Sequence, residues 1–178
     1  MPLHKKPELR LDSHTWRLPD ARAAAARVLA VPDLIKPLLR ALASDNPLLR
    51  QRAADTARRV TETQPALLVP HADRLLDIFS ESANDNWRTR AAHLGLVVAR
   101  TAKSASQKRR AAGLLMPLYY DPSNVVRCTA IEDLGMLARA DTTLRAQFEG
   151  LAEEALTTGT LAMRNRAQHA LARLSRPS

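Results

Sequence analysis

Apolar residues recur along the chain with the spacing of one helical face, and the same pattern appears four times. Each copy contains an arginine, and successive arginines are 38, 39 and 37 residues apart. An apolar residue precedes each arginine, an alanine stands at offset +3, and small or apolar residues stand at +7 and +10. These offsets fall on one stripe of an α-helix. The pattern predicts four equivalent helices, which contain Arg50, Arg88, Arg127 and Arg164.

A potential helix-capping residue stands four positions before each arginine. The four are Asn46, Asn84, Ser123 and Thr160. Such side chains accept hydrogen bonds from the free amides of a first helical turn. Pro47 follows the first of them, at a position where a proline loses no helical hydrogen bond. We therefore expect a helix to begin directly after each capping residue.

Other apolar-periodic segments lie before these four helices. They span residues 32–43, 66–80, 106–120 and 142–157. Each segment and the helix that follows it predict a helical hairpin. One hairpin is too thin to bury its own apolar stripe, so neighbouring hairpins must stack. A period of about 37 to 40 residues is typical of an α-solenoid.

The stretch "DPSNVVRCTAIEDLG", residues 121–135, resembles the second helix of HEAT repeats, whose pattern is Asp-x-x-x-x-Val-Arg-x-x-Ala. The matching residues are Asp121, Val126, Arg127 and Ala130. The other three repeats keep the arginine and the alanine, but their residues at the aspartate position are Ser44, Ser82 and Thr158. The resemblance covers about residues 32–175. It implies an all-α fold, a right-handed α-solenoid of four HEAT-like hairpins, which is an architecture with many functions.

Residues 1–31 precede the repeats and differ from them. Within this region "LPDARAAAARVLAV" predicts one more helix, with Pro19 at its start and Pro32 after its end. It lacks the spacing of the other helices, as a terminal capping element does. We expect a tail and a capping helix over residues 1–31, followed by residues 32–178 as one continuous domain. Its four repeats are expected at about 32–63, 64–103, 104–140 and 141–178.

Composition agrees with a helical protein that works without disulfides. Apolar residues make up 46% of the chain and aromatic residues only 3%, so Leu, Ala and Val must fill the core. Cys128 is the single cysteine, which is typical of a reducing compartment. No window approaches the roughly 18 to 20 apolar residues of a membrane span. These features favour a cytoplasmic protein that does not enter the membrane.

Charge is divided unequally between the two sets of predicted helices. The whole chain carries a formal net charge of +9. The arginine-containing helices together carry +9, the segments before them −3, and the first 31 residues +3. In HEAT-like arrays the second helices line the concave surface, so the resemblance implies a basic groove. Such a groove favours an acidic partner.

Candidate groove residues lie opposite the core stripe or beside it on the second helices. They are Gln51, Asp55, Arg58, Arg90, His93, Glu132, Arg166 and His169. Metal ligands must converge within roughly 2.0 to 2.2 Å of one ion, whereas neighbouring helices pack roughly 8 to 10 Å apart. We therefore expect hydrogen bonds or ion pairs between these residues, with no metal, cofactor or catalytic residue. The four repeated arginines are expected to form a structural ladder that bonds to adjacent repeats.

Three functional hypotheses follow. The first is a non-enzymatic scaffold that holds a protein partner, most simply an acidic one, in the basic groove. The alternative is nucleic-acid binding, in which arginines of the second helices contact phosphates, as in a HEAT-like family of DNA glycosylases. That family relies on an Asp with nearby Trp and Arg residues, and no Asp–Trp pair is evident around Trp87. The third hypothesis, a subunit of a lyase or another modifying enzyme, rests on fold analogy.

Overall fold

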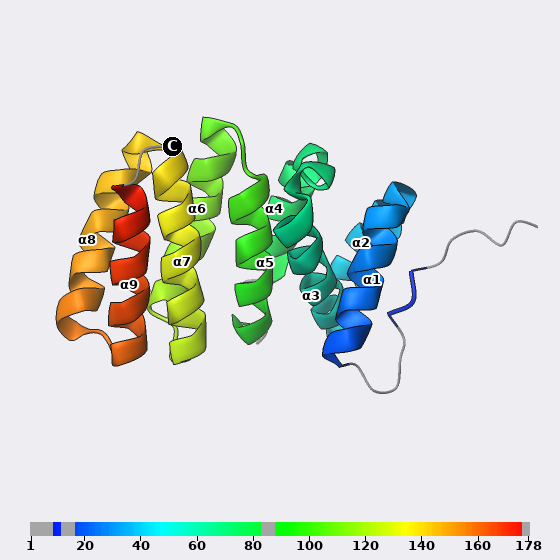
Figure 1. The fold of residues 1–178 in the computed structure, drawn as a ribbon, viewed down its shortest axis with the longest axis horizontal. Coiled ribbons are helices and arrows are strands. Elements are labelled where there is room, and N and C mark those ends of the chain that lie inside the picture. Colours follow the sequence, from blue (N-terminus) through cyan, green and yellow to red (C-terminus); the bar gives the residue numbers. More distant parts are fainter. Residues whose placement is uncertain (1–8, 12–16, 83–87, 176–178) are drawn as a thin grey trace, which may run out of the picture. The chain divides into compact units, whose positions relative to one another are not determined.

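Helices are the regular secondary structure of the described part of the chain. The computed structural model describes residues 9–11, 17–82 and 88–175, with the side chains of residue 18 and residues 88–92 left aside. Within these ranges it contains nine α-helices, three short 3-10 helices and no strand (Figure 1). The all-α prediction is therefore confirmed for these residues. The chain divides into two compact units, Met1–Pro70 and His71–Ser178.

The first unit contains three α-helices. They are α1 (Leu18–Ala30), α2 (Ile35–Leu42) and α3 (Pro47–Thr63), with 3-10 turns at Pro32–Leu34 and Pro65–Leu67. Helices α1 and α2 both pack against α3. The helix predicted in the first 31 residues is thus present as α1. Its first turn is fixed by Asp20, whose Oδ2 accepts a hydrogen bond of 2.7 Å from the amide of Arg17.

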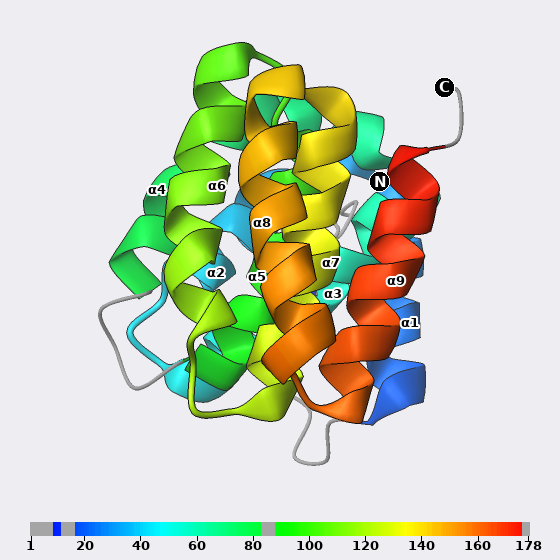
Figure 2. The same ribbon diagram turned by 90° about the vertical axis from the view of Figure 1, so that its left-hand side faces the viewer.

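The second unit contains three helical hairpins. Their helices are α4 (Ala72–Ser82) and α5 (Arg88–Thr101), α6 (Ala105–Tyr119) and α7 (Asn124–Ala140), and α8 (Thr142–Thr158) and α9 (Leu161–Leu174). Helix α7 contacts both α5 and α9, so the second helices of the three hairpins form one row. Helices α4 and α6 pack together behind this row. Figure 2 shows the last hairpin from the side, with α8 next to α9.

Two of the predicted first helices are shorter than expected. The segment expected at 66–80 forms an α-helix only from Ala72, after a second 3-10 turn at Val69–His71. Pro70 has no amide proton and its ring clashes with the preceding turn, so a regular α-helix cannot run through this residue. In the segment expected at 32–43 the chain first makes the turn Pro32–Leu34, and α2 then begins at Ile35 with Pro37 in its first turn, where a missing amide proton breaks no helical hydrogen bond. The other two predicted segments, 106–120 and 142–157, correspond to α6 and α8 and agree with their bounds to within two residues.

The predicted capping residues are used unequally. Asn46 accepts hydrogen bonds from the amides of Leu48 and Leu49, at 3.0 and 3.2 Å. Thr160 accepts one from the amide of Met163 at 3.3 Å. Ser123 occupies the N-cap of α7 without a capping bond from its side chain. Asn84 lies outside the described residues.

The predicted apolar stripe forms the core of each second helix. Alanine at offset +3 is fully or almost fully buried in the three described cases, and Ala91 lies among the side chains that are left aside. The stripe of α7 is buried at all four offsets, by Val126, Ala130, Leu134 and Leu137. Leu171 in α9 is half-buried. None of the helices in the described ranges is long and apolar enough to cross a bilayer.

Candidate partner-binding surface on helices α7 and α9

One glutamate on α7 pairs with two arginines on α9. Arg166 Nη1 donates a short hydrogen bond to Glu132 Oε1, and Arg173 Nη2 lies 3.9 Å from the same oxygen. The ion pair raises the pKa of Arg166 and keeps its guanidinium charged. Both arginine side chains remain about half exposed. Glu132 and Arg166 were both predicted groove residues, and the structure brings them together.

Cations outnumber anions on the surface that these two helices form. Helices α7 and α9 contain five arginines and two acidic residues. One of the acids, Asp133, is buried, and the other, Glu132, is half-buried with 28% of its side chain exposed. We call the following residues the α7–α9 surface: Glu132, Arg139, Arg166, His169 and Arg173.

A small cavity lies within this surface. Its volume is about 110 Å³, and it is lined by Glu132, Gly135, Met136, Arg139, Ala170 and Arg173. Gly135 allows the close approach, because a Cβ atom there would lie 2.9 Å from the Cβ of Ala170. Arg139 is exposed and forms no ion pair with any described residue. The cavity therefore offers two guanidinium groups beside a small apolar floor.

Arg139 and Arg173 were not among the predicted groove residues. A signal was present, because Arg139 follows Glu132 by seven residues and Arg173 follows Arg166 by seven. Seven residues are two helical turns, so each pair shares one face of its helix. His169, which was predicted, lies between the arginines of α9 and is exposed. Its backbone carbonyl accepts a hydrogen bond of 3.2 Å from Arg173 Nε.

The lone cysteine lies beside this surface. Cys128 is buried on α7, and burial raises the pKa of its thiol above the ordinary value. Positive charge from Arg166 and Arg127 acts in the opposite direction and offsets part of that rise in pKa. The thiol is therefore the neutral, less nucleophilic form at neutral pH.

Asp133 is an acid in a core position that sequence reasoning missed. It stands at offset +6, where the other described residues Thr56, Leu94 and Ala170 are also buried. Its Oδ2 has no hydrogen-bond partner among the described residues, and burial raises the pKa of the carboxyl group well above its ordinary value. Glu132 raises this pKa further, whereas Arg100 lowers it. Asp133 thus places a buried carboxyl group in the core with one oxygen unsatisfied by any described residue.

The groove residues predicted in the first unit form a network on one helix. Asp55 Oδ1 lies 3.4 Å from both Arg58 Nη2 and Arg59 Nε, and Arg58 Nη1 donates a short hydrogen bond to Glu62. Arg58 is therefore neutralised by carboxylates of its own helix. Gln51 is half-buried nearby on α3.

The three repeated arginines whose side chains are described differ in burial. Arg50 and Arg127 are half-buried, whereas Arg164 is exposed and forms no ion pair with a described residue. The side chains of Arg88 and Arg90 lie outside the described set, as does Trp87. His93 is half-buried on α5. The bonding of these arginines to adjacent repeats stays a prediction.

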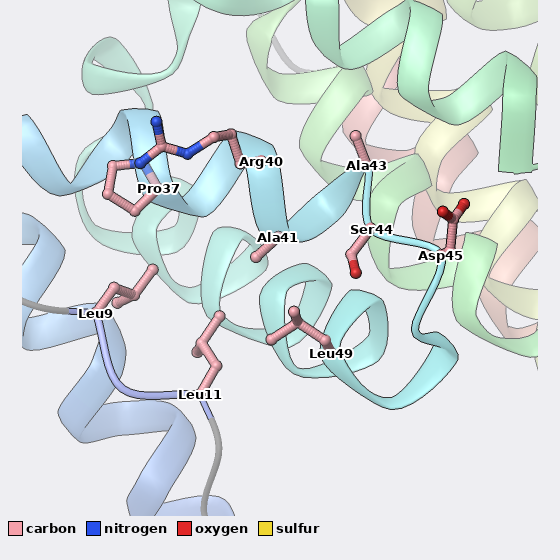
Figure 3. Close-up of a pocket in the computed structure, with 9 residues that line it drawn as sticks. All are labelled: Leu9, Leu11, Pro37, Arg40, Ala41, Ala43, Ser44, Asp45 and Leu49. Atoms are coloured by element: carbon pink, nitrogen blue, oxygen red, sulfur yellow. The ribbon is translucent and has the colours of Figure 1, made fainter.

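A second pocket lies in the first unit. Its volume is about 560 Å³, and the segment of residues 9–11, helix α2, the loop after it and Leu49 line it (Figure 3). Buried Arg52 holds this segment in place, because its Nη1 donates a hydrogen bond of 2.7 Å to the carbonyl oxygen of Leu11. The polar groups around the pocket are Arg40, Ser44 and Asp45. They do not form a constellation that indicates catalysis.

Known proteins add no further assignment. No group of three His, Cys, Asp or Glu side chains in the described ranges could hold a metal ion. No protein-family model matches the chain, and a comparison with curated proteins finds no significant match. The fold and the surface therefore define an all-α protein of packed helical hairpins with a basic face on its last two second helices.

Proposed function

We propose that the protein is a non-enzymatic α-solenoid scaffold of HEAT-like hairpins, which binds an acidic protein segment through the α7–α9 surface. The observation that carries this proposal is the charge of that surface, which holds three exposed arginines, Arg139, Arg166 and Arg173, and one half-buried acid, Glu132. A partner that supplies carboxylates offsets this excess of positive charge.

The arrangement of the hairpins supports the architectural part of the proposal. In the second unit each second helix contacts the next one in the row, as in a stacked repeat array. The α2–α3 hairpin has the same order of elements and the same apolar stripe, so it is proposed as the first member of the series. Helix α1, which packs on α3, is proposed as the N-terminal cap.

Positive charge on the opposite layer is partly used inside the molecule. Lys108 Nζ on α6 donates a hydrogen bond of 2.7 Å to the carbonyl oxygen of Ala140, and Arg110 pairs with Asp77 on α4 at 2.7 Å. On α8, Glu149, Glu153 and Glu154 outnumber the single arginine. An acidic partner is therefore attracted to the second helices rather than to the first helices of the same unit.

A binding titration tests the proposal. The probe is a fluorescein-labelled oligoglutamate peptide, and the comparison probes are an oligoglutamine peptide and a labelled DNA duplex. Saturable binding of oligoglutamate, weaker at higher salt, is expected because salt screens exposed charges over about 8 to 10 Å at physiological ionic strength. Binding of the duplex alone, with affinity falling steeply as salt rises, would support the nucleic-acid alternative and overturn the proposal.

Matched charge reversals locate the site. The variant Arg139→Glu changes an exposed arginine of the α7–α9 surface and should weaken peptide binding strongly. The control Arg109→Glu makes the same change of charge at an exposed position on α6. Neither arginine forms an ion pair with a described residue, so both variants should keep the melting temperature of the parent protein. Equal losses of binding in both variants would mean that total charge alone attracts the peptide.

A further inference from the structure

The arginines of the α7–α9 surface already hold one carboxylate of their own chain. Glu132 Oε1 meets Arg166 and Arg173 at the edge of the 110 Å³ cavity. This pairing crosses from one helix to the next, so it does not arise from the regular spacing within one helix. The same two guanidinium groups are therefore in contact with an anion before any partner arrives.

One carboxylate leaves these two arginines far from saturated. A guanidinium group carries five N–H donors, and a carboxylate accepts through two oxygens. Arg166 and Arg173 both contact the same oxygen, Oε1, and Arg173 does so only at 3.9 Å. Arg139 adds a third guanidinium group at the cavity without an ion pair among the described residues. The cluster thus has two positive charges more than Glu132 neutralises.

We propose that the cavity between α7 and α9 is a binding site for one carboxylate side chain of an acidic protein segment, and that Glu132 is its internal competitor. The partner carboxylate enters beside Arg139 and Arg173 and takes over guanidinium donors that Glu132 holds in the free protein. Glu132 then loses an ion pair and faces a second negative charge. This inference rests on the proposed function and assigns its principal contact.

If Glu132 competes with the partner carboxylate, removing its charge should raise the affinity for the acidic peptide. Replacing an acidic residue of the site by its uncharged analogue, Glu132→Gln, should strengthen binding of the oligoglutamate peptide. A half-exposed ion pair contributes about 0.2 to 1 kcal/mol, so the expected gain is about 1.4- to 5-fold in affinity. The gain should shrink as salt is added, because screening weakens the competing pair and the new contact alike.

A matched control separates local competition from net charge. Glu149→Gln makes the same change of net charge on α8, where Glu149 pairs with Arg145 at 3.0 Å within one helix. It lies in the same unit, and Glu149 is the more exposed of the two, with 43% of its side chain exposed against 28% for Glu132. The affinity for oligoglutamate should stay unchanged in this variant. An equal gain in both variants would overturn the assignment of the site.

Loss of the cavity cations completes the test. The variant Arg139→Gln/Arg173→Gln should lower the affinity for oligoglutamate by about tenfold. When Glu132→Gln is added to this variant, it should no longer raise the affinity, because the three groups share one contact. Thermal unfolding of every variant shows whether the fold is retained. If the parent protein binds oligoglutamate and Glu132→Gln binds no better, the internal-competitor assignment fails while the proposed function stands. If neither the parent nor Glu132→Gln binds the peptide, both proposals fail.

Discussion

Gly95 on α5 and Asp133 on α7 occupy one shared space. A Cβ atom at residue 95 would lie 2.7 Å from Asp133 Oδ2 and 2.9 Å from the side chain of Leu115. Real Cβ atoms do not approach other atoms so closely, so the absence of a side chain at residue 95 is what admits the carboxyl group of Asp133. The glycine and the buried acid are therefore one structural unit, although they stand 38 residues apart in the sequence.

Adding a methyl group at this contact should destabilise the second unit. In an exposed helix Gly→Ala stabilises by roughly 0.5 to 1 kcal/mol, but Gly95→Ala must displace two buried side chains. We expect a net loss of about 1 to 3 kcal/mol in the free energy of unfolding, as for other overpacked cores. Urea denaturation measures it. Gly113→Ala on α6 is the control, because a Cβ atom there meets nothing within 4 Å and should give the usual gain.

Asp133 should make the protein less stable as pH rises above the acidic range. Burial raises the pKa of its carboxyl group in the folded state, so the folded protein holds this proton more tightly than the unfolded chain does. The contribution to stability is fully present below the unfolded pKa of about 3.9 and is lost as pH rises through the raised folded value. Asp133→Asn cannot ionise and should flatten this slope. Parallel slopes of the two proteins in urea denaturation between about pH 4 and pH 8 would contradict the assignment.

Removing the Arg52 guanidinium group should release residues 9–11 from the first unit. Arg52 is buried and donates a hydrogen bond of 2.7 Å to the carbonyl oxygen of Leu11. Hydrogen bonds from charged donors contribute about 1.5 to 3 kcal/mol, and Arg52→Met also leaves that carbonyl oxygen unpaired. Amide hydrogen exchange should therefore accelerate around Leu11. Arg22→Met, at an exposed position on α1, should leave the exchange unchanged.

Tyr119 should ionise only in strongly alkaline solution. Burial is the main cause that raises the pKa of its phenol to about 12, with a further contribution from Glu154. Its hydroxyl group also donates a hydrogen bond of 3.0 Å to the carbonyl oxygen of Leu151 on α8. The folded pKa lies above the unfolded value of about 10, so this contribution to stability is present below about pH 10 and is lost as pH rises through about 12.

Ultraviolet titration of tyrosinate tests this order of ionisation. The chain has two tyrosines, and Tyr120→Phe leaves Tyr119 as the only phenol. The apparent pKa of this variant should lie near 12, and a value near 10 would show that the Tyr119 hydroxyl is accessible to solvent. Tyr119→Phe should cost about 0.5 to 1.5 kcal/mol, because it removes one neutral hydrogen bond.

The helices could be predicted because each second helix repeats the same local chemistry. The stripe around Arg127 identified Val126, Ala130, Leu134 and Leu137 as core, and all four are buried. Such a stripe depends only on spacing within one helix. Pro70 shows the limit of periodicity, since the apolar pattern continues through it while the missing amide proton stops the α-helix.

The candidate site was predictable only in part, because it depends on contacts between helices. Glu132 and Arg166 were placed correctly on second helices, but their pairing requires the relative rotation of α7 and α9. Arg58 illustrates the opposite case. Its positive charge on a second helix suggested a contact with a partner. In the structure, Asp55 and Glu62 of the same helix neutralise the Arg58 guanidinium group. Counting charges by helix cannot separate these two situations.

Asp133 was missed because sequence periodicity treats a charged residue as a surface residue. Its offset of +6 is a core position in the other repeats, where Thr56, Leu94 and Ala170 are buried. Comparing the repeats position by position, rather than reading each helix alone, would have marked it. The room for its carboxyl group comes from Gly95 on another helix.

The position of Cys128 gives the protein a built-in chemical reporter. It is the single thiol of the chain, it is buried on α7, and its pKa is raised. A thiol-specific reagent can therefore react only when an opening of the structure exposes the Cys128 side chain on α7. The rate of labelling then measures how often this part of the second unit opens, without any engineered probe. Because the thiol lies close enough to Arg166 and Glu132 for their charges to affect it, a change in those two side chains should also alter the intrinsic reactivity of the exposed thiolate.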